Sequence, residues 1–469
     1  MKNTCLDVAA PQVGDLLSPL SIVDVGVEGQ GLARHNGRVV FLDGGLPGAL
    51  VSAIVRRVSK KACFADIVSF LAPSPHEVPA PCPHALVCGA CLWQHFDLEA
   101  ARQWKRNHIA QCLARIGKAP QVPVAPLVAS PQNRNFRNKM SFAFGPGPEN
   151  NCLLGLRSRG GHDIVEINSC LLQDAPVMEL LAFVRQRVNE LGLPAWTGRG
   201  KGASGYLRHL VTRRSHYGLL VECISGPAWR KAARQSGADL PGLVKLLGNE
   251  LMERFSLSGF VHGERHQADD LALSERKVCV LGNDYLKEQI GHLELRVPCG
   301  AFLQTNTGAA EELYALIERE AALTGREVVW DLFCGIGSIG LYLARGAGQV
   351  HGCESVKDSL QAARQNARDL GYDNCRFYQI DLSKGLDADL PAPDVVIVDP
   401  PRAGLSEALI AHLLKVKPRV LLYVSCDVGT QARDCARLSE KWLAQKALPV
   451  DMFPGTPHVE NILVFTARQ

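Results

Sequence analysis

Cys426 stands where a reactive thiol could do chemistry. It follows the apolar run "RVLLYVS" and precedes "DVGTQARDCARL", which predicts a strand ending at the cysteine and a helix over 430–445. An ordinary thiol with a pKa of about 8.5 is only about 3% ionised at pH 7. The positive end of a helix lowers the pKa of a neighbouring thiol, so this setting predicts a cysteine nucleophile.

A glycine-rich turn predicts where a nucleotide-like ligand binds. In "VVWDLFCGIGSIGLYLA", Gly335, Gly337 and Gly340 have the GxGxxG spacing between an expected strand and an expected helix. Glycines allow the backbone to approach a ligand closely. Glu354 ends the next strand, where an acidic side chain can bind a ribose.

The residues around this turn favour S-adenosylmethionine over a nicotinamide cofactor. Asp331 and Phe333 lie between the strand and the first glycine, and Asp399 begins the stiff Asp-Pro-Pro segment of "VVIVDPPRAGL". Such a segment at the carboxyl end of a strand lies over the crevice where ligands bind. A methyltransferase is therefore the first hypothesis, and a dehydrogenase is its rival.

A methyltransferase that uses a nucleophilic thiol has a restricted choice of methyl acceptor. Nitrogen and oxygen acceptors have their own lone pairs, whereas carbon 5 of uracil or cytosine becomes nucleophilic after a thiolate adds to carbon 6. A base must then remove the carbon-5 proton. Glu460 and His458, both in "DMFPGTPHVENILVF", are the candidates, and their spacing does not choose between them.

Four cysteines form a second candidate site. "PCPHALVCGACLWQ" contains Cys82-x5-Cys88-x2-Cys91, and Cys170 follows far downstream. Such a set suits tetrahedral zinc or an iron–sulfur cluster, and the absence of paired CxxC units slightly disfavours zinc. Most of the other cysteines are interpreted as small buried hydrophobic residues.

The expected elements make this an α/β protein. Alternation with helices predicts a doubly wound, Rossmann-like sheet with strands at 328–333, 349–353, 375–380, 394–399, 419–425 and 461–466. About five short strands over 13–72 predict a small OB-like barrel, and a helix is expected over 97–116. With a mixed α+β centre, the expected domains are 1–74, 75–298 and 299–469.

Composition and charge limit where the protein can reside and what it can bind. The 469 residues are 46% hydrophobic and 21% charged, and no apolar run is long enough to span a membrane. The N-terminus lacks a signal-peptide pattern, so a cytoplasmic protein is expected. The net charge is only +4, but residues 101–140 contain eight Lys or Arg and no Asp or Glu. Charge alone leaves phosphate binding and a solvated helix face equally open.

Five motifs, in this order, resemble the S-adenosylmethionine-dependent RNA uracil-5-methyltransferases: "FLQTN", "DLFCGIGSIG", "DPPRAGL", "YVSCD" and "DMFPGTPHVE". The resemblance implies that Cys426 is the nucleophile and Glu460 the base. It also implies donor contacts from Gln304, Phe333, Gly335, Gly337, Ser338, Glu354, Asp381 and Asp399. Several members of the family have Asn where this chain has Ser338, which puts that side-chain contact in doubt.

The resemblance extends to the metal and to RNA. Members with the same cysteine pattern bind a [4Fe-4S] cluster, which implies ligands Cys82, Cys88, Cys91 and Cys170. "GQGLARHNGRVVFLDGGLPGALVSAIV" is similar to the TRAM domain of RNA-modifying enzymes. Cluster and TRAM together favour 23S rRNA as substrate, with tRNA as the alternative and cytosine methylation as a third possibility.

Basic segments with interleaved aromatic residues predict an RNA-contacting surface. "NRNFRNKMSF" contains Arg134, Phe136, Arg137 and Lys139, and "GYLRHLVTRRS" is a second candidate. A rival from another class is an RNA-binding protein that has kept the fold without activity, but the presence of both Cys426 and Glu460 argues against it. A monomer is expected.

Overall fold

The structure is a computed structural model that describes residues 11–198, 204–226, 237–386 and 389–468. These residues form two compact units. The first contains residues 11–86, 90–105 and 453–458, and the second contains the other described residues. The three expected domain boundaries stay a prediction.

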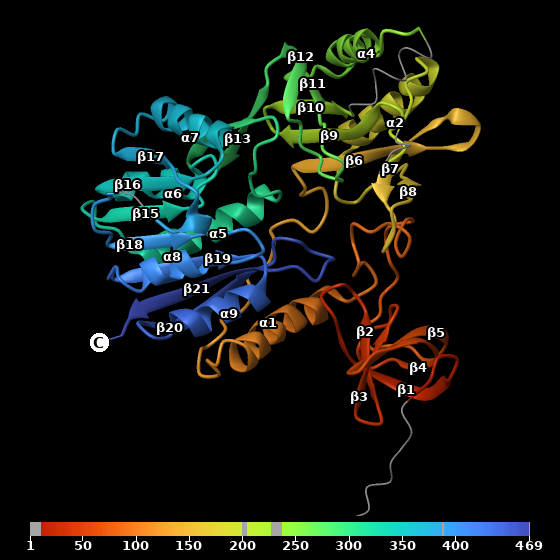
Figure 1. Cartoon of the computed structure of the whole chain (residues 1–469), viewed down its shortest axis with the longest axis horizontal. Coiled ribbons are helices and arrows are strands. Elements are labelled where there is room, and N and C mark those ends of the chain that lie inside the picture. Colours follow the sequence, from red (N-terminus) through yellow and green to blue (C-terminus); the bar gives the residue numbers. More distant parts are fainter. Residues whose placement is uncertain (1–10, 199–203, 227–236, 387–388, 469) are drawn as a thin grey trace, which may run out of the picture. The chain divides into compact units, whose positions relative to one another are not determined.

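The N-terminal part of the first unit is a closed five-stranded barrel, drawn in red in Figure 1, with the strand order β1-β2-β3-β5-β4. Its strands are β1 (Leu16–Val25), β2 (Gly31–His35), β3 (Arg38–Leu42), β4 (Leu50–Val58) and β5 (Ala62–Ala72). Asn36 and Gly37 have φ values of 49° and 77°, as a tight hairpin turn between β2 and β3 requires. The prediction of a small barrel is confirmed.

The central part of the second unit is a seven-stranded sheet with the order β12-β11-β10-β9-β6-β7-β8. Its strands are β6 (Lys139–Pro146), β7 (Cys152–Arg157), β8 (Ile164–Glu166), β9 (Leu207–Ser215), β10 (Gly218–Ser225), β11 (Gly259–Glu264) and β12 (Arg276–Gly282). Two helices pack on it, α2 (Ala175–Glu190) against β7 and α4 (Leu240–Phe255) against β11. A separate hairpin is formed by β13 (Tyr285–Ile290) and β14 (Leu293–Pro298).

The C-terminal part is a second seven-stranded sheet with the order β17-β16-β15-β18-β19-β21-β20 (Figure 1). Its strands are β15 (Val328–Leu332), β16 (Gln349–Glu354), β17 (Cys375–Gln379), β18 (Val395–Val398), β19 (Val420–Ser425), β20 (Trp442–Val450) and β21 (Glu460–Ala467). The first five strands in the sheet order are parallel, and β21 runs antiparallel to both β19 and β20. The predicted Rossmann-like fold is confirmed.

Helices connect these strands. They are α5 (Thr307–Ala321), α6 (Ser338–Leu343), α7 (Lys357–Asp369), α8 (Glu407–Leu413) and α9 (Val428–Leu438). Short 3-10 turns are η1 (Pro148–Asn150), η2 (Ala344–Gly346) and η3 (Leu382–Lys384). Because the carboxyl ends of parallel strands share one edge of the sheet, the loops before these helices gather there.

The helix predicted over 430–445 is wrong in its second half. Helix α9 ends at Leu438, and Trp442–Val450 is the strand β20, which the sequence analysis missed. Residues 440–447 are rich in Glu, Lys, Leu, Ala and Gln, which favour a helix locally. Pairing with β21 from Trp442 to Val450 overrides that local preference.

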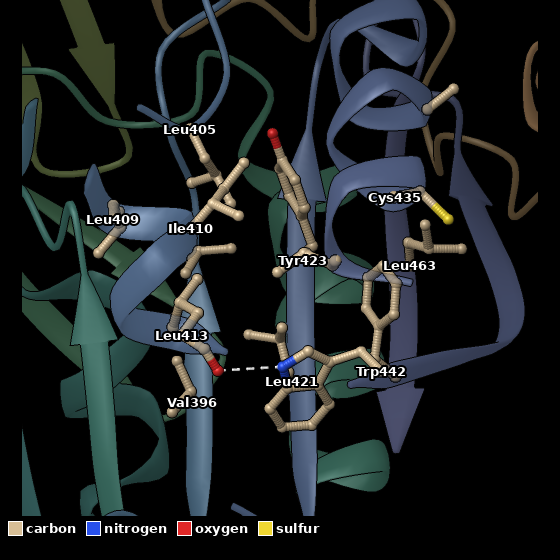
Figure 2. Packing of buried hydrophobic residues seen from close by; sticks show 14 of the residues in the cluster. Val396, Leu405, Leu409, Ile410, Leu413, Leu421, Tyr423, Cys435, Trp442 and Leu463 are labelled. Atoms are coloured by element: carbon tan, nitrogen blue, oxygen red, sulfur yellow. Dashed lines mark hydrogen bonds between the residues drawn. The ribbon is translucent and has the colours of Figure 1, made fainter. Parts of the chain in front are cut away.

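A buried cluster packs α8 and α9 onto the C-terminal sheet, and Figure 2 shows part of it. Trp442, 1% exposed, donates a hydrogen bond from its indole nitrogen to the Leu413 carbonyl at 3.0 Å. Ile109 and Leu113, from the second half of α1 (Leu98–Arg115), belong to the same cluster. Among the described helices, none combines the length and apolarity that crossing a bilayer requires.

Candidate active site

Cys426 lies at the ligand-binding edge of the C-terminal sheet. It is the residue between the end of β19 at Ser425 and Asp427, the N-cap of α9. The Asp427 carboxylate accepts a hydrogen bond from the Thr430 amide at 2.8 Å, which fixes where the helix begins. The Cys426 side chain is half-buried.

Glu460 is brought to the same place by the antiparallel strand β21. Ser425 pairs with Asn461, and continuing this register by one residue sets Glu460 opposite Cys426. Glu460 is 3% exposed, and its Oε2 has no hydrogen-bond partner among the described residues. His458, the competing base, belongs to the first unit, where its ring packs on Phe453.

The charges around Cys426 differ from the sequence expectation. Burial raises the pKa of the Cys426 thiol to about 11, and the carboxylates of Glu460 and Asp399 add to the shift, while Arg402 opposes it. The expectation of a lowered thiol pKa was therefore wrong, because desolvation and negative neighbours outweigh the end of α9. Burial also raises the pKa of Glu460 well above its usual range, with Asp399 adding and Arg402 opposing.

Arg402 is a candidate site residue that the sequence analysis did not single out. Its guanidinium hydrogen-bonds Cys426 and is the cation that favours the charged forms of both Cys426 and Glu460. It comes from the loop that follows β18. The signal was present, because Arg402 is the fourth residue of the "DPPRAGL" motif.

A small pocket of about 30 Å³ lies at the glycine-rich turn. Its lining includes five of the predicted donor-binding residues, namely Gln304, Phe333, Gly335, Ser338 and Asp399. Tyr314, which was not predicted, also lines it and shares a hydrogen bond of 2.8 Å with the Ser338 hydroxyl.

The backbone conformation of the turn explains why it contains glycines. Phe333 has a φ of 66° and Gly337 a φ of 81°, both in the left-handed region. A Cβ on Gly337 would meet the Phe377 ring at 3.1 Å. Gly337 therefore shapes the turn but does not line the pocket.

Acidic side chains surround the pocket. Asp331 accepts a hydrogen bond from the Gly340 amide at 2.8 Å through one oxygen, and its Oδ1 has no partner among the described residues. Burial raises the pKa of Asp331 to about 7, and burial followed by the nearby Asp331 charge raises the pKa of Asp399 to about 7. Such carboxyls suit a ligand that brings positive charge or hydrogen-bond donors.

Glu354 and Asp381 have more local contacts. Glu354 accepts hydrogen bonds from the amides of Gly335 at 3.2 Å and Val356 at 2.8 Å, so it supports the turn from the end of β16. Asp381 caps η3 by accepting from the Ser383 amide at 3.1 Å and pairs with Lys384 at 3.2 Å. Neither residue lines the described pocket.

The four predicted metal ligands are all described and half-buried. Cys82 and Cys91 belong to the first unit, and Cys88 and Cys170 belong to the second. Within the described ranges, no group of three or more His, Cys, Asp or Glu side chains is placed to hold a metal ion. The cysteines are suitable iron ligands by chemistry, but their arrangement adds no support for the cluster.

The predicted RNA-contacting segments are corrected in part. Phe136 is 7% exposed, so it packs inside instead of offering a free ring. Arg208 is also buried and donates to the carbonyls of Arg265 and Gln267 at 3.0 and 2.8 Å. These residues stabilise the central sheet, whereas Arg134 remains exposed. Burial could not be foreseen from the alternation of basic and aromatic letters.

Comparisons with known proteins point in one direction. Residues 263–468 match the protein family described as tRNA (uracil-5-)-methyltransferase, and residues 19–68 match the TRAM domain. The chain is 38% identical over 450 residues to an uncharacterized RNA methyltransferase of Nitratidesulfovibrio vulgaris, with 94% of each chain covered. A similar relative from Gloeobacter violaceus is 34% identical over 442 residues, with 92% of this chain and 93% of the relative covered.

A solved structure has the same fold. It is the Pyrococcus abyssi tRNA (uracil-54, C5)-methyltransferase in complex with S-adenosyl-L-homocysteine, with a TM-score of 0.73 and 23% sequence identity. The similarity covers 95% of this chain and 100% of that one.

Proposed function

The chain belongs to the RNA uracil-5-methyltransferase family and has a TRAM domain, and from this premise we propose that it methylates carbon 5 of a specific uridine in 23S rRNA. The donor is S-adenosylmethionine. The observation that supports this reaction best is the placement of the Cys426 thiol and the Glu460 carboxyl on facing positions at the ligand edge of one sheet.

Cys426 makes carbon 5 reactive. Its thiol gives up a proton to solvent, and the thiolate adds to carbon 6 of uracil, so that the electron pair of the 5,6 double bond moves toward carbon 5 and the carbon-4 oxygen. Arg402 stabilises the thiolate, which burial otherwise disfavours. Carbon 5 can then form a bond to an electrophilic methyl group.

Glu460 completes the reaction. As a carboxylate it takes the proton from the alkylated carbon 5, the double bond re-forms, and the bond between carbon 6 and sulfur breaks with its electrons returning to Cys426. Burial makes this carboxylate a stronger base than an exposed one, because it raises the pKa of Glu460. The proton then passes to solvent, which restores both groups.

The pocket at the glycine-rich turn would hold the donor. When bound, S-adenosylmethionine supplies a methyl group on a positively charged sulfur. Gln304, Phe333 and Asp399 line the pocket and would position it, and the unpartnered Oδ1 of Asp331 suits a donor group on the ligand. Asp399 also lies close enough to raise the pKa of both Cys426 and Glu460, so the donor pocket and the reacting pair are neighbours.

The choice of RNA rests on resemblance. The cysteine pattern together with a TRAM domain is typical of the members that act on 23S rRNA. A tRNA is the second candidate, because the matched family is described by that substrate. The deciding experiment maps 5-methyluridine by mass spectrometry in both RNAs from cells with and without the gene. Loss of one 23S rRNA site supports the proposal, and loss in tRNA alone selects the alternative.

We also propose a [4Fe-4S] cluster bound by Cys82, Cys88, Cys91 and Cys170, which the cysteine pattern supports. Methyl transfer to uracil is not a redox reaction, so its role would be structural. Anaerobically purified protein should show broad absorption near about 400 nm, with iron and sulfide in equal amounts. Cys170→Ser should lose this absorption and Cys279→Ser should keep it. Stoichiometric zinc without iron would contradict the assignment.

A further inference from the structure

Helix α9 packs a buried carboxylate against the turn that carries Arg402. Asp434, in the second turn of this helix, is 0% exposed. One of its oxygens accepts hydrogen bonds from the Leu405 amide at 2.8 Å and from the Tyr423 hydroxyl at 2.9 Å. The other oxygen accepts from the Arg433 guanidinium at 2.9 Å. Burying a carboxylate is costly unless donors of this kind surround it, so these contacts hold Asp434 and its partners in one arrangement.

The turn itself lies at the surface. Arg402 and Ala403 are exposed and occupy its two central positions, and the Gly404 amide closes it by donating to the Pro401 carbonyl at 2.9 Å. The Arg433 guanidinium donates to the Ala403 carbonyl at 2.8 Å, so α9 binds this segment at a second point. A short surface turn has little core of its own to fix its position. The position of this turn therefore depends on the helix.

Gly404 allows the turn to approach the helix closely. Its φ is 78°, in the left-handed region that favours glycine. A Cβ at this position would collide with an Asp434 carboxylate oxygen and with the Arg433 guanidinium. The missing side chain of Gly404 and the polar side chains of α9 therefore fit one another, and a larger residue in the turn would push the two segments apart.

The same helix begins beside the thiol. Asp427, the residue after Cys426, is the N-cap of α9. Three charged groups from separate segments act on the thiol, namely Glu460 of β21, Asp399 after β18, and Arg402. Arg402 is the cation among them, and its attraction for a thiolate falls as the distance between them grows. Helix α9 therefore joins the proposed nucleophile to the group that favours its charged form.

We propose that Asp434 is a positioning residue, which holds the turn of Arg402 where the guanidinium can stabilise the Cys426 thiolate. The inference rests on the proposed function for the role of the thiol. Asp434 acts through Arg402 and makes no contact with the reacting atoms. A carboxylate that served stability alone would change the free energy of unfolding when substituted, but it would leave the reactivity of Cys426 in the folded protein unchanged.

The test follows alkylation of Cys426 by iodoacetamide in the full-length protein, which needs neither RNA nor a methyl donor. Trypsin releases residues 420–433 as a peptide whose one cysteine is Cys426, so mass spectrometry reports on this thiol alone. The thiolate is the form that reacts. Asp434→Ala removes both acceptor oxygens and should be alkylated about fivefold more slowly than wild type at about pH 8. An unchanged or faster rate in the folded variant would overturn the proposal.

Tyr423→Phe is the matched control. It removes one donor to the same Asp434 oxygen while the bond from the Leu405 amide remains, so it should cost stability and keep the alkylation rate within about twofold of wild type. Equal slowing in Tyr423→Phe and Asp434→Ala would show a general loss of packing and count against the proposal. Gly404→Ala displaces the turn from its own side and should slow alkylation as Asp434→Ala does, which gives a second variant if Asp434→Ala does not fold.

A double variant shows whether Asp434 acts through Arg402. Arg402→Gln alone should slow alkylation of the thiol because the cation is lost. In this background Asp434→Ala should cause no further slowing, since no cation remains to be positioned. An effect of the same size with and without Arg402 would contradict the assigned role.

Methyl transfer to RNA is measured separately on the same samples. A protein whose thiol responds to these substitutions as expected, but which methylates neither 23S rRNA nor tRNA, would contradict the proposed reaction and leave the role of Asp434 standing. A protein that methylates RNA while its thiol reacts equally fast in wild type and Asp434→Ala would do the reverse.

Discussion

Glu460 lies one residue beyond the last pair of the β19–β21 ladder, Ser425 with Asn461, so this register continued by one position sets Glu460 opposite Cys426. Side chains at facing positions of an antiparallel pair lie on the same side of the sheet. Strand register thus brings the proposed nucleophile and the proposed base together, although 34 residues separate them in sequence.

The first prediction is a trapped adduct in Glu460→Gln. Without a carboxylate to remove the carbon-5 proton, the methylated base should stay attached to Cys426, giving an RNA–protein band on a denaturing gel. Cys426→Ser should give no band and lower kcat by at least about 10³-fold. Cys279→Ser, a cysteine of β12 outside the site, should behave like wild type. Equal trapping in the Glu460 and Cys426 variants would reverse the assigned roles.

The methylation rate should rise with pH, and Arg402 should determine the pH range over which it rises. The thiolate is the reactive form, and burial raises the pKa of Cys426 to about 11, so the active fraction increases from neutral to alkaline pH. Arg402→Gln removes the opposing cation and should reduce the rate at pH 7 by about tenfold, with the rise displaced to higher pH. Single-turnover rates across this range test it, and Arg402→Lys should lie between the two. An unchanged profile would exclude Arg402 from thiolate stabilisation.

Asp331 should make stability depend on pH. Burial raises its pKa from 3.8 to about 7, so the folded protein binds this proton more tightly than the unfolded chain does. The stability it contributes is present below about pH 4 and is lost as the pH rises toward 7. The side chain of Asp331→Asn can still accept from the Gly340 amide. The free energy of unfolding of this variant should therefore rise relative to that of wild type by on the order of 2–4 kcal/mol as the pH increases from 4 to 8. Denaturant unfolding at each pH measures this difference. For the surface variant Asp373→Asn, the difference in free energy of unfolding from wild type should not change with pH.

Trp442→Phe should destabilise the C-terminal sheet. The substitution leaves the buried Leu413 carbonyl without its donor at 3.0 Å, which costs about 1–3 kcal/mol. Urea unfolding should show this loss, while Leu443→Ala, on the neighbouring exposed side chain, should change stability little. Methylation by the folded variant should remain near wild type, since Trp442 lies outside the donor pocket. A variant as stable as wild type would show that the hydrogen bond contributes nothing measurable.

Much of the catalytic sheet could be predicted because its strands are short apolar runs bounded by recognisable turns. Motifs at strand ends pointed to Cys426 and Glu460, whose roles stay a prediction, and five of the residues predicted to bind the donor line one pocket. Strand β20 was missed because its residues favour a helix until β21 pairs with them. Long-range pairing of this kind leaves no local periodic signal.

Burial was the other quantity that sequence reasoning misjudged. Phe136 and Arg208 look like nucleic-acid contacts in a row of letters, yet both are enclosed by the central sheet and its loops. The direction of the Cys426 pKa shift was predicted wrongly for a related reason. The approach of Glu460 and Asp399 depends on how separate strands are ordered, which only the folded chain reveals.

The interior position of β21 has a consequence for how the protein matures. Until residues 460–467 have been synthesised, β19 has an unpaired edge and β20 has no partner in the sheet. An open, apolar edge invites pairing with other chains, so the nascent protein is most prone to aggregate at this stage. The strand that closes the edge is also the one that carries Glu460, so the chain loses its exposed apolar edge and acquires its proposed general base in a single step.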